Sequence, residues 1–226
     1  MFFDPMWILL MVVSTVLGLA TQGYIKSSFR KWGNVPTRSG MTGAEVARKI
    51  LDTNGLQSVA IQQVAGNLSD HYDPRSKTLG LSASVYGQAS VAAAGVAAHE
   101  AGHAVQDARE YVWGNVRTAM VPAVNLGSSM SWILIMAGFF LQLTGLIWVG
   151  IAFYSAAVLF QFVTLPVEFD ASKRAMASLE STGALDAGQL AGARQVLTAA
   201  ALTYVAATLI AVLQLLYYVV LARGRD

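Results

Sequence analysis

The chain has 226 residues, of which 55% are hydrophobic and only 12% carry a charge. Soluble domains carry about 25% charged residues, so the composition excludes intrinsic disorder and a coiled coil and indicates a membrane protein. A net charge of +2 without a basic run excludes a nucleic-acid-binding module. The absence of cysteine excludes disulfides, thiolate metal ligands and a cysteine nucleophile.

The first predicted element is a membrane helix over residues 5–25, which contain no charged side chain. About 20 apolar residues are enough to cross a bilayer. A signal peptide begins with positive charge, whereas here the cations Lys26, Arg30 and Lys31 follow the apolar run. We therefore expect an uncleaved anchor with its N-terminus outside and residues 26–117 in the cytoplasm.

The polar region that follows is predicted to be a small α+β unit. Thr42 and Glu45 have the spacing of a capping box, which opens a short helix. Alternating segments predict a small, mostly antiparallel sheet of two or three strands, at residues 59–64, 68–72 and 78–82, with turn residues at 73–76. The alanine-rich segment 90–111 contains no proline and predicts a helix capped near Ser90.

The rest of the chain predicts three further membrane crossings. Residues 118–167 carry no charge and are long enough for a hairpin of two spans, at 118–141 and 144–166. Pro166 can start a separate helix, so we expect a cytoplasmic helical region over 167–194 and a last span over 195–222. The prediction is one domain over residues 1–226, a mainly α integral membrane protein with four transmembrane helices.

The one strong motif is the His-Glu-Ala-Gly-His run at residues 99–103. On a helix, residues four apart share a face, so His99 and His103 can bind one metal ion. Glu100 lies about 100° further round the helix, where it can take a proton from a water at the metal and pass it to a leaving amine. The motif predicts a zinc site with Glu100 as the general base.

A catalytic zinc uses three protein ligands and a water, and four residues are candidates for the third ligand. Without cysteine, it must be His71 or a carboxylate. Asp107 shares the stripe of the two histidines, but three ligands on one straight helix would splay past the metal, so Asp107 is better placed to support them. Glu168 and Asp170 directly follow the third span, on the same predicted side of the membrane as the motif. The competing interpretation is that these two acids favour the start of a helix.

Three separated segments resemble the neutral zinc metallopeptidases of the YugP-like membrane family. They are the 99–103 run, Leu165-Pro-Val-Glu-Phe-Asp-Ala-Ser172 and Leu68-Ser-Asp-His-Tyr-Asp-Pro-Arg-Ser-Lys-Thr-Leu79, and the likeness covers most of the chain. The resemblance implies a zincin-like catalytic portion, a small β-sheet plus the HExxH helix, at the surface of a bacterial cell membrane. It also implies one Zn²⁺ per chain and a protein or peptide substrate.

A looser resemblance, to the HtpX and CAAX prenyl protease class of gluzincins, concerns the third ligand. Those enzymes use a Glu-x-Glu-Ala-Asp element whose first Glu binds zinc. Aligned on it, Glu168 is the ligand, Asp170 matches the second acid and Ser172 replaces the final Asp. That Asp normally holds a ligand histidine, so the resemblance implies a different support here, for which Asp107 and Asp170 are candidates.

Two other sets of residues have open roles. His71 is a candidate fourth metal ligand, an oxyanion donor or a hairpin stabiliser, and the resemblance places its segment at an edge strand above the cleft. Lys173 and Arg174 could stabilise an oxyanion, although cations at the end of a membrane helix more often extend toward water.

The sequence therefore predicts a membrane-embedded zinc endopeptidase with a cytoplasmic site. The alternative is a non-catalytic membrane scaffold with a structural zinc, closed by His71 as the fourth ligand. An intramembrane protease is disfavoured because the apolar run before His99 is far shorter than a span. The expected partners are the lipid bilayer and a protein or peptide substrate, membrane proteins included, and no nucleic acid; substrate identity and oligomeric state are not encoded in these patterns.

Overall fold

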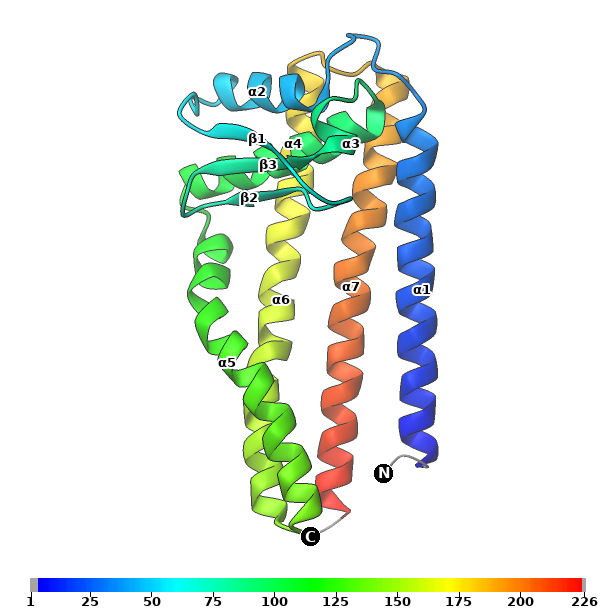
Figure 1. The fold of residues 1–226 in the computed structure, drawn as a ribbon, viewed down its shortest axis with the longest axis vertical. Helices are drawn as coiled ribbons and strands as arrows, with labels where there is room; N and C mark the ends of the chain where they lie inside the picture. The colour runs from blue at the N-terminus through cyan, green and yellow to red at the C-terminus, as the bar shows by residue number, and fades with distance from the viewer. Residues whose placement is uncertain (1–3, 225–226) are drawn as a thin grey trace. The chain divides into compact units, whose positions relative to one another are not determined.

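The structure, a computed structural model, describes residues 4–224. Figure 1 shows the elements in chain order: α1 (Pro5–Gly33), α2 (Gly43–Thr53), β1 (Ala60–Val64), β2 (His71–Asp73), β3 (Thr78–Ser82), α3 (Ala83–Tyr86), α4 (Val91–Ala108), α5 (Val112–Phe140), α6 (Thr144–Ser181) and α7 (Ala187–Arg223). These elements form two compact units. We call them the spanning unit (residues up to 21, 115–166 and from 203) and the polar unit (residues 22–114 and 167–202).

Four helices, α1, α5, α6 and α7, are long and apolar enough to cross a membrane, as predicted. Within the spanning unit, α5 ends at Phe140 and α6 begins at Thr144, so the hairpin turns where the sequence indicated. A β-carbon at Gly150 would lie 3.0 Å from the carbonyl oxygen of Ser131 and 2.6 Å from the Ile135 side chain. Glycine at this position therefore lets α5 and α6 pack closely, as small residues do between membrane helices.

Pro166 does not begin a new helix, contrary to the sequence expectation, and lies inside the continuous α6. Proline removes one backbone donor from a helix, but the long runs of helical residues on both sides keep their own hydrogen bonds. The helix ends at Ser181, close to Gly183, whose φ of +62° suits glycine. One continuous helix therefore connects the third apolar run to the segment that contains Glu168.

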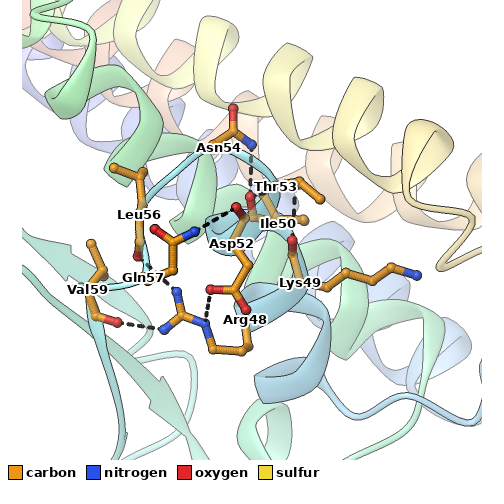
Figure 2. Close-up of polar contacts among 9 residues, drawn as sticks. All are labelled: Arg48, Lys49, Ile50, Asp52, Thr53, Asn54, Leu56, Gln57 and Val59. Carbon is orange, nitrogen blue, oxygen red and sulfur yellow. Dashed lines mark hydrogen bonds and ion pairs between the residues drawn. The ribbon is translucent and has the colours of Figure 1, made fainter.

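In the polar unit, helix α2 begins with the predicted capping box. The Thr42 hydroxyl accepts a hydrogen bond from the Glu45 amide, and the Glu45 carboxylate accepts one from the Thr42 amide. Figure 2 shows how Arg48 fixes the connection from α2 to β1. Its guanidinium pairs with Asp52 and donates to the carbonyl oxygens of Leu56 (2.9 Å) and Val59 (2.8 Å).

The sheet has three strands in the order β1-β3-β2 (Figure 1). The β2–β3 hairpin is antiparallel and turns at residues 74–77, where the Asp73 carboxylate accepts hydrogen bonds from the Arg75 amide and the Ser76 hydroxyl. The prediction of a mostly antiparallel sheet is wrong, because β1 pairs with β3 in parallel over five residues, from Ala60–Thr78 to Val64–Ser82. The central strand β3 is almost entirely buried, and each outer strand has one unpaired edge.

The core of the polar unit lies around α4. Alanine dominates this helix, and its small side chains let other elements approach from several sides. Among the described residues, the buried cluster combines residues of α2, β3, α4, α6 and α7, including Ile50, Leu79, Leu81, Ala97, Ala101, Leu179 and Ala193. The helix that carries the motif is therefore the centre of the unit and positions its side chains rigidly.

Candidate metal centre

The two motif histidines lie one turn apart on α4. The side chain of Ser90 caps this helix by accepting a hydrogen bond from the Ala93 amide. The rings of His99 and His103 are 4.7 Å apart, centroid to centroid, in an edge-to-face arrangement. Their side chains are 13% and 15% exposed, so both rings are largely screened from water yet accessible from one side.

Glu168 of α6 completes a cluster with these rings. Its Oε2 atom lies 3.2 Å from the Nε2 atom of His99 and 3.6 Å from that of His103. The ligand atoms of the three residues all lie within 4.8 Å of one another. Donors bound to a tetrahedral zinc at about 2.0–2.1 Å stand roughly 3.3 Å apart. The two donor distances to Glu168, 3.2 and 3.6 Å, are close to this value, and two imidazoles with one carboxylate are a donor set of catalytic zinc sites.

A glycine allows α6 to come this close to α4. A β-carbon at Gly102 would lie 2.7 Å from the carbonyl oxygen of Ala171, a distance that β-carbon atoms essentially never show. Ala171 is three residues from Glu168 on α6. The glycine inside the motif therefore determines how near the carboxylate approaches the two histidines.

This close approach yields a prediction with a matched control in the same helix. Gly102→Ala must push α6 away from α4, and overpacking of this kind costs about 1–3 kcal/mol. Gly95→Ala meets the β-carbon of Ala193 at an ordinary 3.5 Å, and alanine is favoured over glycine in a helix by about 1 kcal/mol. We expect Gly102→Ala to lower both the Tm and the zinc content of the purified protein, and Gly95→Ala to leave both at or above wild type.

Each histidine has a hydrogen-bond partner on its other nitrogen. The Nδ1 atom of His103 lies 3.0 Å from the Oε1 atom of Gln106, and that of His99 lies 3.2 Å from the Ser172 hydroxyl. An amide oxygen only accepts, so Nδ1 of His103 carries a proton and Nε2 is the ring nitrogen that faces the cluster. Outer partners of this kind fix the ring orientation and the tautomer that a metal needs.

Gln106 is a supporting residue that the sequence analysis missed. It is 3% exposed, and its amide nitrogen donates to the Val167 carbonyl and to the Asp170 carboxylate, each at 2.8 Å. Asp170 also pairs with Arg174. The resulting chain of hydrogen bonds connects His103 to α6 on both sides of Glu168. Gln106 lies three residues after His103, and residues at this spacing share a helix face. This spacing is the signal in the sequence that could have identified Gln106 as a partner of His103.

The pKa of His103 shows the balance of charges at the cluster. Burial alone lowers the pKa of a histidine. The hydrogen bond to Glu168 and the negative charges of Glu100 and Glu168 outweigh that effect, so the pKa of His103 lies above its usual value. The cluster thus favours positive charge at this position.

Glu100 lies next to this cluster with its carboxylate uncommitted. It is 9% exposed. Within residues 4–224, its carboxylate forms no hydrogen bond or ion pair with another group. It follows His99 directly on α4, and its charge contributes to the raised pKa of His103. A carboxylate held near the cluster without a partner can accept a proton there.

The residues expected to support the histidines occupy different positions. Ser172 contacts His99 directly, and Asp170 reaches His103 through Gln106. Asp107 instead accepts hydrogen bonds from the Tyr72 hydroxyl (2.7 Å) and from Lys77 (2.6 Å). Burial and then the bond to Asp107 raise the pKa of Tyr72. Asp107 therefore ties the β2–β3 hairpin to α4 and does not substitute for the missing Asp.

His71 lies on β2, opposite Gly80 of β3. Its exposed ring has Nδ1 2.9 Å from the Ser69 carbonyl oxygen, so Nδ1 carries a proton. Within residues 4–224, the cluster that could hold an ion does not include His71. No contact of His71 therefore favours the alternative of a structural zinc that it closes.

Two imidazoles, one carboxylate and an uncommitted glutamate on an HExxH helix make up the side-chain set of zinc-dependent hydrolases. A family model described as "Putative neutral zinc metallopeptidase" matches residues 7–223. The chain is also 43% identical over 222 residues to the "Putative membrane protease YugP" of Bacillus subtilis (strain 168), covering 98% of this chain and 99% of that protein. The chain therefore belongs to this family of neutral zinc metallopeptidases, as its motifs predicted. No solved structure matches the chain.

Proposed function

We propose that the chain is a membrane-embedded zinc endopeptidase with a zincin-like site, in which His99, His103 and Glu168 hold one zinc ion. The observation that carries the proposal is the convergence of three donor atoms within 4.8 Å of one another, with Glu168 only 3.2 and 3.6 Å from the two histidines. Membership of a zinc peptidase family and the printed name of the Bacillus relative, a membrane protease, support the same assignment.

The proposed chemistry divides the work between the ion and the chain. When bound, zinc supplies a Lewis acid that polarises a peptide carbonyl and lowers the pKa of a water toward 7. Glu100 accepts the proton of the attacking water and delivers it to the leaving amine nitrogen. Ser172 and Gln106 hold the two imidazoles in the orientation that directs Nε2 to the cluster.

The substrate is proposed to be an extended peptide that adds to the sheet. Strand β2 is an outer strand with one unpaired edge, and peptides bind such edges through main-chain hydrogen bonds. The cations that follow the first apolar run favour a site on the cytoplasmic side of a bacterial cell membrane.

The proposal is tested by proteolysis with purified protein in detergent, using a quenched fluorescent peptide library. We expect cleavage that 1,10-phenanthroline abolishes and that added Zn²⁺ restores, while the non-chelating 1,7-isomer has no effect. Cleavage that persists after chelation would contradict a zinc-dependent mechanism.

His71 is proposed to act on the substrate side of the site. Because its Nδ1 proton is engaged by the Ser69 carbonyl, only the Nε2 position is available to a substrate, as a donor when the ring is protonated. We expect His71→Ala to keep zinc and the wild-type Tm but to lower kcat/KM by about 10²-fold, the effect of losing one oxyanion donor. A lower Tm with unchanged kcat/KM would instead make His71 a hairpin stabiliser.

A further inference from the structure

A cavity lies beside the metal centre, within the polar unit. It has a volume of about 360 Å³ and lies between α6 and α7. Both helices contribute residues at spacings of three and four, so each presents one face to it. The residues that matter for its chemistry are Phe169, Ser172, Lys173, Met176, Arg194 and Leu197.

Two cations in this cavity have no partner. Lys173 and Arg194 are exposed, and no hydrogen bond or ion pair connects either side chain to another residue in the described part of the chain. The neighbouring Arg174, by contrast, pairs with Asp170 and lies over the ring of Tyr111. Two uncompensated positive charges at one cavity favour a ligand that carries a negatively charged group.

Most of the remaining wall of the cavity is apolar, although Thr198 also lines it. Phe169 is 48% exposed, Leu197 is buried and Met176 lies between these extremes. An anion with no hydrocarbon attached would leave this wall wet. The cavity therefore matches a ligand that joins a negatively charged group to an apolar chain.

The position of the cations along the chain indicates where such a ligand comes from. The uncharged run of α6 ends at Val167, six residues before Lys173, and the uncharged run of α7 begins at Gln195, just after Arg194. Lys173 and Arg194 thus stand at the polar ends of two candidate membrane spans, the level at which lipid headgroups lie. Basic pockets between membrane helices at this level bind anionic lipid headgroups.

We propose that this cavity binds the phosphate headgroup of an anionic phospholipid, with Lys173 and Arg194 as the phosphate-binding residues. Ser172 links it to the metal centre, because its hydroxyl both lines the cavity and contacts Nδ1 of His99. While its oxygen accepts from His99, its own proton can be donated to a phosphate oxygen. A bound headgroup would thereby help to orient one metal-binding imidazole.

The test measures binding without using peptidase activity. The purified protein is reconstituted in nanodiscs of phosphatidylcholine with or without phosphatidylglycerol, and its Tm is recorded. Because a ligand that binds only the folded state stabilises it, we expect phosphatidylglycerol to raise the Tm of the wild type by about 5 °C. The double variant Lys173→Gln/Arg194→Gln should keep the wild-type Tm in phosphatidylcholine and lose this rise.

A charge-matched control separates the cavity from general attraction to an anionic surface. Lys26→Gln/Arg30→Gln removes two exposed cations that follow the apolar run of α1 and line a different pocket, and it should keep the rise. An equal loss in both double variants would overturn the proposal, as would the same wild-type Tm with and without phosphatidylglycerol. Equal stabilisation by inorganic phosphate or by an acidic peptide, added without anionic lipid, would also overturn it. Charge-conserving Lys173→Arg should retain the rise in Tm. The unchanged Tm of the double variant in phosphatidylcholine excludes misfolding as the reason why that variant loses the rise.

Discussion

Replacing Glu100 by Gln is expected to leave one zinc per chain in place and to lower the rate of proteolysis by about 10²–10⁴-fold. Glu100 has an uncommitted carboxylate beside the cluster and is not one of its three converging donors. Glutamine keeps the size and the burial of the side chain but cannot accept the proton of an attacking water. The loss should therefore appear in kcat, with zinc content and Tm unchanged.

The matched control for Glu100→Gln is Glu110→Gln, which neutralises an exposed glutamate two residues beyond the end of α4. It should retain full activity, because general electrostatic changes at the surface are screened. Full proteolysis by a zinc-loaded Glu100→Gln protein would contradict its role as the base. Loss of zinc in that variant would show that Glu100 acts as a ligand instead.

Replacing Glu168 by Ala is expected to abolish stoichiometric zinc binding. The change removes one of three donors and leaves the two imidazoles without the carboxylate that contacts both of them. The loss of zinc affinity should exceed the 10–100-fold that removal of an outer supporting group costs. Competition against a fluorescent chelator measures the affinity.

Two further variants make this second prediction specific to Glu168. Glu180→Ala changes an exposed glutamate of the same helix and should bind zinc normally. Asp170→Asn removes the negative charge that accepts from Gln106 and pairs with Arg174, which weakens the chain to His103 and should cost about 10–100-fold in affinity. If Glu168→Ala kept its zinc while Asp170→Asn lost it, the third ligand would be Asp170.

Much of the fold was predictable because it depends on local signals. Uncharged runs located the four apolar helices, and the Thr42–Glu45 spacing located the start of α2. Strand pairing is not local. The alternation of residue types indicated strand β1, but it did not indicate that β1 pairs in parallel with β3 and not with β2, the next strand in the sequence. The continuation of α6 through Pro166 was also hidden, because a proline in sequence is compatible with either a start or an interior position.

The site was predictable as far as the family's motifs extend. The spacing of His99 and His103 indicated a shared ion, and the resemblance selected Glu168 among the candidate third ligands, a residue that the structure brings within reach of both histidines. The supports were not predictable, because which groups meet Nδ1 depends on how α6 packs on α4. That packing depends on Gly102 and places Ser172 and Gln106, rather than Asp107, beside the rings.

The most direct test of the central claim is X-ray absorption spectroscopy at the zinc edge of the purified wild-type protein. The account predicts about one zinc per chain, surrounded by four nitrogen or oxygen neighbours near 2.0–2.1 Å, with multiple scattering from two imidazoles. Three imidazoles would show that His71 closes a structural site, and the absence of zinc would contradict the account altogether.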